Sequence, residues 1–307
     1  MQTPENSRSK TSAHLRLVAA AALLLMLLAA GEAAQRVSEY DDGRLWRISR
    51  PGLPDSFVLG TIHVADARVS PVTRPVAEAL ASSRTLAMEL LPIAVDATQV
   101  EELETLPDGR RLEPLVGEAA YARLRRELVA QGIAETAIER MKPWAAMLRV
   151  ARIAPEGDLR SLDENVFAAA RARRMRIAPL EGIEDQVMAF DAVPLESQVA
   201  LLVHALEHRD ALAALTEPTI ATWLRGDLAA LARIPERTTR EFPDMGRHYD
   251  ALARHVVRNR TAVLHHRLFL PLREGRMFVA VGAAHLQGDA GLLAMLRRDG
   301  YRVTPIW

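Results

Sequence analysis

The amino-acid sequence predicts an α/β protein: a mixed β-sheet flanked by helices, with a large helical region before the C-terminal strands. Two observations support this class. Segments with apolar residues at helical spacing separate the strand-like runs, and the pattern is almost entirely helical from 195 to 272. The short apolar runs that predict strands lie near both ends of the chain and in its middle, at 56–59, 85–90, 176–180, 277–281 and 301–306.

The first 33 residues have the composition of a secretory signal. Basic residues precede an unbroken apolar stretch over 17–30, and small residues follow it. This stretch is shorter than the roughly 20 residues that cross a bilayer as a helix. We therefore expect residues 1–33 to be removed and residues 34–307 to form a single domain in the periplasm or outside the cell, with no stable membrane span. Retention of the segment as an uncleaved anchor is the alternative.

The expected elements follow one another without a linker. Turn residues over 51–55 separate two strand-like runs and predict a β-hairpin over 46–59. Ser161 and Glu164 have the spacing of a capping box, which predicts the start of a helix. The other expected elements are a helix over 71–83, a strand over 85–90, helices over 118–131 and 134–151 with a break at Pro143, a strand over 176–180, the helical region over 195–272, a strand over 277–281, a helix over 290–299 and a strand over 301–306.

Composition excludes several classes of site. The chain has no cysteine, so disulfides, thiolate metal sites and a cysteine nucleophile are absent. It carries 39 basic and 39 acidic residues, and a formal net charge of +0 argues against nucleic acid as the main partner. No nucleophile elbow, P-loop or dinucleotide fingerprint occurs in the sequence. The oligomeric state is left open.

A repeated sequence motif is the main indication of function: an apolar strand that ends in Gly-x-x-His. The first copy runs from Gly60 to His63, and the second runs from Gly282 to His285. Glycine at the end of a strand is expected to let the backbone turn sharply, so that the following side chain points into a cleft. Imidazole is the commonest metal ligand and a natural general base near neutral pH. We expect the two histidines to meet at one site.

Glu89 interrupts the apolar strand over 85–90. Burying a carboxylate without a partner costs several kcal/mol, so a cation, a metal or a hydrogen-bond donor is expected beside it. With His63 and His285 it completes the two-histidine, one-carboxylate ligand set of a catalytic metal site that keeps a position for water. The sequence leaves open whether Glu89 binds the divalent ion or acts as the general base, and Mn, Co and Zn all remain candidates.

A second candidate metal motif lies in the helical region. Residues 204–208 match the inverted zinc-peptidase order H-x-x-E-H, and histidines four apart share a helix face. No partner acid is identifiable, and the helix is amphipathic, so we interpret His204 and His208 as a solvated helix face. His265 and His266 point in different directions and are interpreted as surface or packing residues.

Taken as a whole, the pattern resembles the TraB/GumN family, which includes membrane metalloproteases of the Tiki type. The matching positions are 45–46, 60–63, 88–90, 162–163, 179–181, 186, 223, 226–227, 258–259, 281–286, 288, 291 and 300–303. The resemblance implies a mixed α/β fold with a divalent-metal site made by His63, His285 and Glu89. It also implies that Arg258 occupies a polar position that steadies an oxyanion or holds a carboxylate.

The resulting hypothesis is a secreted or periplasmic metal-dependent hydrolase whose substrate is a peptide or protein. The alternative is a non-catalytic envelope protein that binds a metal, haem or another ligand in the same cleft. A third interpretation makes the histidines core residues of a helical envelope scaffold. Glu89→Gln separates the first two, because a binding protein tolerates the change whereas a hydrolase loses turnover.

Overall fold

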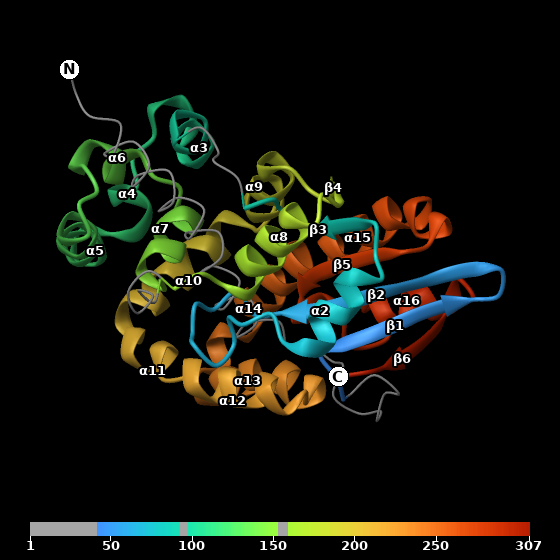
Figure 1. Cartoon of the computed structure of the whole chain (residues 1–307). Coiled ribbons are helices and arrows are strands. Elements are labelled where there is room, and N and C mark those ends of the chain that lie inside the picture. The colour runs from blue at the N-terminus through green and yellow to red at the C-terminus, as the bar shows by residue number, and fades with distance from the viewer. Residues whose placement is uncertain (1–41, 93–96, 153–158) are drawn as a thin grey trace, which may run out of the picture.

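The computed structural model describes residues 42–92, 97–152 and 159–307. The expected signal segment over 1–33 lies outside these residues, and its removal therefore stays a prediction, as does the single domain over 34–307. Element labels follow Figure 1.

One half of the fold, on the right in Figure 1, is built around a mixed six-stranded sheet, and the other half is helical. Its order is β4-β3-β5-β2-β1-β6. β2, β5, β3 and β4 pair in parallel, while β1 pairs antiparallel with both β2 and β6. The strands are β1 (Leu45–Arg50), β2 (Leu53–Thr61), β3 (Thr85–Met88), β4 (Arg176–Pro179), β5 (Met277–Gly282) and β6 (Arg302–Pro305). The predicted α/β class is confirmed.

The centre of the sheet is set by β2 and β5. Every residue of β5 is buried, as expected for a strand covered on both faces. The parallel register aligns Gly60 with Val281 and Thr61 with Gly282, so the two Gly-x-x-His motifs leave neighbouring strands one residue out of step. The expected hairpin is also present, because β1 and β2 are joined through a turn in which Gly52 has a φ of 81°.

Helices occupy most of the remaining described residues. Figure 1 shows α2 in front of the sheet and α16 behind it. The helices that precede β4 are α2 (Arg74–Ala81), α3 (Ala97–Glu104), α4 (Glu113–Val116), α5 (Glu118–Ala130), α6 (Glu135–Arg140), α7 (Pro143–Val150) and α8 (Leu162–Ala172). Those that follow β4 are α9 (Ile183–Asp191), α10 (Leu195–Glu207), α11 (Arg209–Ala213), α12 (Thr216–Arg225), α13 (Leu228–Glu241), α14 (Gly246–Leu252), α15 (Arg260–Phe269) and α16 (Leu292–Arg298).

Short helical turns complete the set. They are η1 (Pro107–Gly109), η2 (Pro243–Met245), η4 (Pro271–Glu274) and η5 (Ala283–His285), while η3 (Ala253–Asn259) is a π-helix. The break expected at Pro143 separates α6 from α7, and the Ser161 capping box begins α8 as expected.

The helical half lies at the carboxyl ends of the central strands. In Figure 1 the arrows of β2 and β5 point towards it. Within this half α10 packs against α7, α5 and α14, and one hydrophobic core runs through both halves. Residues that follow these strands therefore lie between the sheet and the helices, where α/β proteins commonly bind ligands.

His204 corrects one interpretation from the sequence. It is buried rather than solvated, and its ring lies 4.5 Å from that of His208, 4.6 Å from that of Phe242 and 5.8 Å from that of Tyr249, measured between centroids. Burial, and to a lesser degree His208, lower the pKa of His204 to about 4. The sequence pattern misses this because Phe242 and Tyr249 come from later segments that fold over α10.

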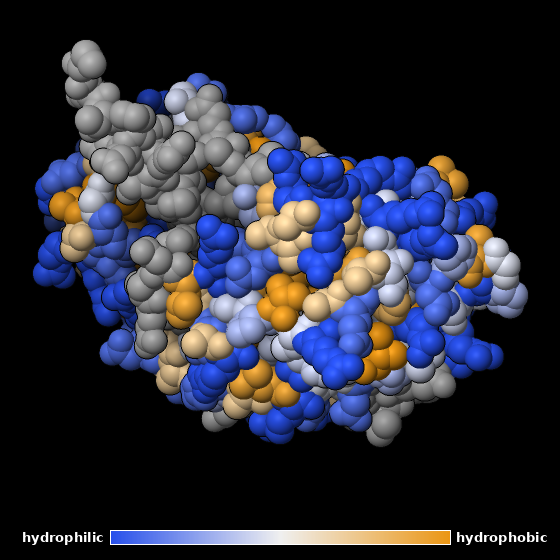
Figure 2. All heavy atoms as spheres, in the orientation of Figure 1, coloured by the Kyte–Doolittle hydropathy of each residue, from blue (hydrophilic) through white to orange (hydrophobic). Residues whose placement is uncertain are grey.

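No single helix in the described part of the chain is long and apolar enough to cross a membrane. α9 and α10, which are bent by 95° relative to each other, meet the length and composition criteria only as a pair. On the face seen in Figure 2, hydrophobic residues form small separate groups among hydrophilic ones.

Candidate active site

Four parallel strands bring polar side chains to one edge of the sheet. His63 follows β2, His285 follows β5, Glu89 follows β3 and Glu181 follows β4. Because parallel strands share a direction, their carboxyl ends meet at the same edge. The structure thus brings together His63, Glu89 and His285, which the sequence predicts as one site.

His63 is held by Asp163, which lies in the first turn of α8. The Nδ1 atom of His63 is 3.0 Å from Oδ2 of Asp163, and the hydroxyl of Thr61 donates to Oδ1 of the same carboxylate at 2.8 Å. The carboxylate holds the proton on Nδ1, so that Nε2 is the nitrogen that binds a metal once its own proton is lost. An acid in the first turn of a helix is also stabilised by the helix dipole.

The backbone at His63 is unusual. Its φ is 49°, which is the left-handed region that residues other than glycine seldom adopt. Such a conformation costs on the order of 1 kcal/mol and persists only where the surroundings hold it. The bonds from Thr61 and His63 to Asp163 supply that restraint.

His285 has a different partner. Its Nδ1 atom is 2.8 Å from the hydroxyl of Thr261, which itself donates to the carbonyl oxygen of Val257 at 2.8 Å. Nδ1 of His285 is therefore the donor to the Thr261 oxygen. As at His63, Nε2 is left for other interactions, and here it lies 3.7 Å from Oε1 of Glu89.

Gly282 is the point around which the three side chains gather. A Cβ atom at this position would lie 3.2 Å from Nε2 of His63, 3.3 Å from Oε1 of Glu89 and 3.7 Å from Cδ2 of His285. The backbone N–H of Gly282 donates to Oε1 of Glu89. A side chain here would therefore crowd the three functional groups, and His63 and Glu89 would have to shift by a few tenths of an ångström.

Neither glycine of the motifs performs the sharp turn expected from the sequence. Gly60 and Gly282 are not among the glycines with positive φ. A Cβ atom on Gly60 would lie 2.8 Å from Cδ1 of Leu286 and 3.3 Å from Cβ of Ala283. The first glycine therefore lets the second motif pack directly against β2, and it is His63 that takes the positive φ.

Arg260 links the two buried carboxylates. Its guanidinium donates to Oε2 of Glu89 at 3.0 Å and to Oε2 of Glu181 at 2.5 Å, with a further bond from Nε to Oε1 of Glu181 at 3.0 Å. All three side chains are buried. A buried ion pair of this kind is strongly destabilised when one partner is removed, because a buried charge is left without compensation.

The structure does not bring Arg258 to this group. Arg258 is half-buried on the π-helix, and its guanidinium contacts the backbone oxygen of Asp250 at 3.4 Å. Arg260, two residues later, contacts Glu89 instead. A π-helix changes which residues share a face, so the π-helix immediately before Arg260 and Thr261 explains why helical spacing alone does not identify them.

The surroundings shift the pKa values of the three gathered side chains. Burial alone would lower the pKa of His63, but the charge and hydrogen bond of Asp163 outweigh it and raise the pKa to about 9. Burial lowers the pKa of His285 to about 4. Burial would raise the pKa of Glu89, but nearby His285, Arg260 and His63, with the Gly282 N–H, lower it to about 2. Perturbed groups that cluster in this way are typical of functional sites.

The donor types fit a divalent ion, although the ligands are not preassembled. Nε2 of His63 and Oε1 of Glu89 lie beside Gly282, and Nε2 of His285 lies 3.7 Å from the same Oε1. Both Nδ1 atoms have the hydrogen-bonded partners typical of metal-binding histidines. The described residues contain no group of three or more His, Cys, Asp and Glu side chains already arranged to hold a metal ion. These three residues are nevertheless the ones that would hold it.

Comparison with known proteins identifies the family. The model of the TraB/PrgY/gumN family matches residues 44–305, which is most of the chain. This chain belongs to the TraB/PrgY/gumN family. The family match includes all the side chains gathered at the candidate site. No solved structure matches the chain.

The relatives include both named metalloproteases and an uncharacterised bacterial protein. The chain is 25% identical to Metalloprotease TIKI2 of Danio rerio, over 84% of this chain and 60% of that protein. It is 26% identical to Metalloprotease TIKI1 of Homo sapiens, over 84% and 61%. It is also 26% identical to the uncharacterized protein YbaP of Shigella flexneri, over 81% and 90%. The chain thus spans about three fifths of the length of the two metalloproteases.

Proposed function

We propose that this chain is a divalent-metal-dependent hydrolase that cleaves peptide bonds. The observation that carries the proposal is the gathering of His63, Glu89 and His285 around Gly282 at the carboxyl edge of the sheet. Two imidazoles and one carboxylate form the donor set of hydrolytic metal sites that keep a position for water. The word metalloprotease in the names of two relatives supports the same class of reaction.

Each of these side chains would have a defined task. His63 and His285 would bind the ion through Nε2, with Asp163 and Thr261 holding the Nδ1 protons in place. When bound, a divalent ion lowers the pKa of a water molecule towards neutrality and polarises a substrate carbonyl. Oε1 of Glu89 would bind the ion or accept the proton of that water, an alternative that the sequence also leaves open.

Arg260 and Gly282 would keep Glu89 in place during the reaction. The guanidinium holds one carboxylate oxygen of Glu89 and the backbone N–H of Gly282 holds the other, so the carboxylate cannot rotate freely. Arg260 also offsets the negative charge of Glu181. The role that the family resemblance implied for Arg258 is therefore better filled by Arg260, which we propose as a positioning residue for Glu89.

The proposed substrate is a peptide or protein outside the cytoplasm. This location rests on the signal-like composition of residues 1–33. The identity of the metal, among Mn, Co and Zn, is left to experiment.

Calorimetric titration of the chelator-treated protein with Mn, Co and Zn is the first test. One-to-one binding is expected for the native chain and is expected to be lost in His63→Ala and in His285→Ala. Arg258→Ala is the matched control, because its side chain contacts none of the three residues, and it should bind normally. Binding that survives both histidine substitutions would contradict the proposed site.

Turnover is tested with a peptide library and the metal that binds. Glu89→Gln is expected to fold, to keep most of its histidine ligation and to lose cleavage. If the native chain binds metal at this site but cleaves no peptide, and Glu89→Gln behaves like the native chain, the proposal fails in favour of a metal- or ligand-binding envelope protein.

A further inference from the structure

The amino ends of the parallel strands, opposite the candidate site, carry a row of arginines. Arg84, Arg276 and Arg176 stand at the amino ends of β3, β5 and β4, and backbone hydrogen bonds join them in sequence: Arg176 N–H to Arg84 O at 2.9 Å, and Arg84 N–H to Arg276 O at 2.7 Å. Arg174 lies in the turn that enters β4. All four residues are exposed. We call Arg84, Arg174, Arg176 and Arg276 the arginine edge.

Most of the charge on the arginine edge is not neutralised. Arg176 pairs with Glu274 at 2.6 Å, and the neighbouring Arg47 lies 3.8 Å from Asp55. Within the described part of the chain, the guanidinium groups of Arg84, Arg174 and Arg276 form no ion pair. The chain as a whole has a formal net charge of +0, so the arginine edge is more positively charged than the chain on average.

Two of these arginines occupy backbone positions that favour glycine. The φ of Arg174 is 56° and that of Arg276 is 51°. Each costs on the order of 1 kcal/mol relative to glycine in the left-handed region. At Arg174 this conformation belongs to the cap that ends α8, where the N–H of Met175 donates to the carbonyl oxygen of Ala170 at 3.1 Å. The turn itself therefore requires the backbone conformation and does not require an arginine side chain.

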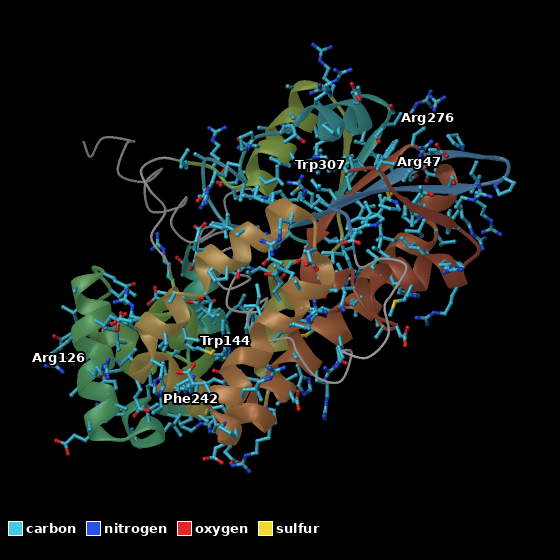
Figure 3. All side chains as sticks on the ribbon, turned by 90° about the horizontal axis from the view of Figure 1, so that it is seen from below. Arg47, Arg126, Trp144, Phe242, Arg276 and Trp307 are labelled. Carbon is cyan, nitrogen blue, oxygen red and sulfur yellow. The ribbon has the colours of Figure 1, made fainter. Side chains whose placement is uncertain are left out.

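Two exposed apolar side chains lie on the segment that leads from α15 into β5. Phe269 ends α15 and Leu270 follows it, in the segment that leads through η4 to Arg276. Phe269 is 38% exposed and Leu270 is 68% exposed, and the guanidinium of Arg273 lies 4.6 Å from the Phe269 ring centroid. In Figure 3, Arg276 and Arg47 lie at one end of the molecule and Arg126 lies at the other.

We infer that the arginine edge, with Phe269 and Leu270, docks onto an anionic phospholipid surface. Clustered arginines attract anionic headgroups, and adjacent apolar side chains enter the boundary between headgroups and acyl chains. A soluble polyanion would account for the arginines but not for the neighbouring exposed Phe and Leu. Because the candidate site lies at the opposite ends of the same strands, docking leaves that site on the side of the protein away from the lipid surface.

The test measures sedimentation of the full chain with two kinds of vesicle, phosphatidylcholine alone and phosphatidylcholine with phosphatidylglycerol. Residues 1–33 are the same in every variant, so the difference in anionic-specific affinity between variants is the readout. This affinity is expected to fall as salt is added, because exposed charges are screened. The test needs no metal and no turnover, so its outcome is independent of the proposed function.

Two triple variants of equal charge change isolate the surface. Arg84→Gln, Arg174→Asn and Arg276→Asn together remove the unpaired arginines, with Asn chosen where φ is positive. The anionic-specific affinity should fall on the order of 100-fold, about fivefold for each arginine. Arg123→Gln, Arg126→Gln and Arg140→Gln together remove three exposed arginines from α5 and α6. This control should retain the affinity.

A third variant separates a lipid surface from other anionic partners. Phe269→Ser with Leu270→Ser is expected to weaken vesicle binding while leaving elution from a heparin column unchanged. An equal loss of anionic-specific vesicle affinity in both triple variants would overturn the inference, because only the net charge of the protein would then determine binding. So would binding to heparin without any preference for anionic vesicles. Matching far-ultraviolet circular dichroism of all variants shows that the changes act on binding.

Discussion

The two Gly-x-x-His motifs have the same sequence pattern but different surroundings. His63 takes a left-handed backbone conformation, is 15% exposed and is held by the carboxylate of Asp163. His285 lies in a 3-10 turn, is 5% exposed and is held by the hydroxyl of Thr261.

This difference teaches that distant partners set the properties of each histidine. Asp163 and Thr261 come from α8 and α15, far from the motifs in the sequence. The charge of Asp163 outweighs burial and favours the imidazolium form of His63, whereas burial dominates at His285 and favours the neutral imidazole. The stability of the protein is therefore expected to depend differently on the two motifs when the pH, a partner residue or the histidine itself is changed.

Arg260→Leu is expected to have the largest effect, because it leaves Glu89 and Glu181 buried without a cation beside the second motif. The loss of unfolding free energy should be about 3–5 kcal/mol. Urea unfolding of the chelator-treated protein measures it. Arg258→Leu is the control and should stay within about 0.5 kcal/mol of the native chain, since it contacts only a backbone oxygen. Equal stability of the two variants would show that Arg260 does not hold this half of the site.

The pH dependence of stability should carry opposite signs for the two histidines. The folded-state pKa of His63 is raised to about 9 from an ordinary value of 6.5, so its contribution is fully present below pH 6.5 and is lost as the pH rises through about 9. The folded-state pKa of His285 is lowered to about 4, so its contribution is present above pH 6.5 and is lost as the pH falls to about 4.

Denaturant unfolding of the chelator-treated protein across this pH range provides the measurement. His63→Gln should flatten the alkaline side of the profile and His285→Gln the acidic side. The burial of His204, whose pKa is also lowered to about 4, adds to the acidic loss in every variant. Identical profiles for the two glutamine variants would remove the proposed asymmetry.

Removing the two hydrogen-bond partners should lower the unfolding free energy by unequal amounts. Asp163→Asn removes a charge-assisted hydrogen bond to His63 and is expected to cost about 2 kcal/mol. Thr261→Val removes a neutral hydrogen bond to His285 without changing side-chain size and is expected to cost about 1 kcal/mol. Thermal unfolding compares them directly, and a larger cost for Thr261→Val would reverse the assigned order.

The smallest effect is a reversal of the glycine–alanine preference. At position 63 the φ of 49° strains any residue with a Cβ, so His63→Gly should be more stable than His63→Ala by about 1 kcal/mol. At position 285 the backbone is helical, so His285→Gly should be less stable than His285→Ala by about 0.5–1 kcal/mol. Finding the same sign at both positions in metal-free protein would argue against strain at His63.

Local patterns were sufficient to predict most of the fold. The hairpin, the strand that precedes Glu89, the capping box at Ser161 and the strand that precedes the second motif all depend on neighbours within a few residues. The gathering of the three candidate residues also followed local signals. His63 and His285 each follow an apolar strand, and Glu89 is an acid in the apolar run over 85–90, although β3 ends at Met88, one residue before it.

The partners of these residues were not predictable in the same way. Asp163 lies inside a capping box, where an acid is expected for local reasons, and nothing near it indicates His63. Arg260 and Thr261 follow a π-helix, which breaks the spacing that assigns helix faces. Among the partner residues, Glu181 could have been found from the sequence, because it is an acid that follows a strand, as Glu89 does. Burial of His204 under Phe242 likewise required the tertiary structure.

The position of β5 has a consequence for how the chain matures. β5 is the penultimate strand in the sequence, yet it is inserted between β2 and β3, both of which are made near the beginning. Pairings between segments so far apart are slow to form, because a long loop must close first. A nascent or truncated chain that ends before residue 277 lacks β5, one of the two central strands, and lacks His285. Such a chain therefore lacks a complete site, and the proposed activity can appear only after synthesis has passed His285.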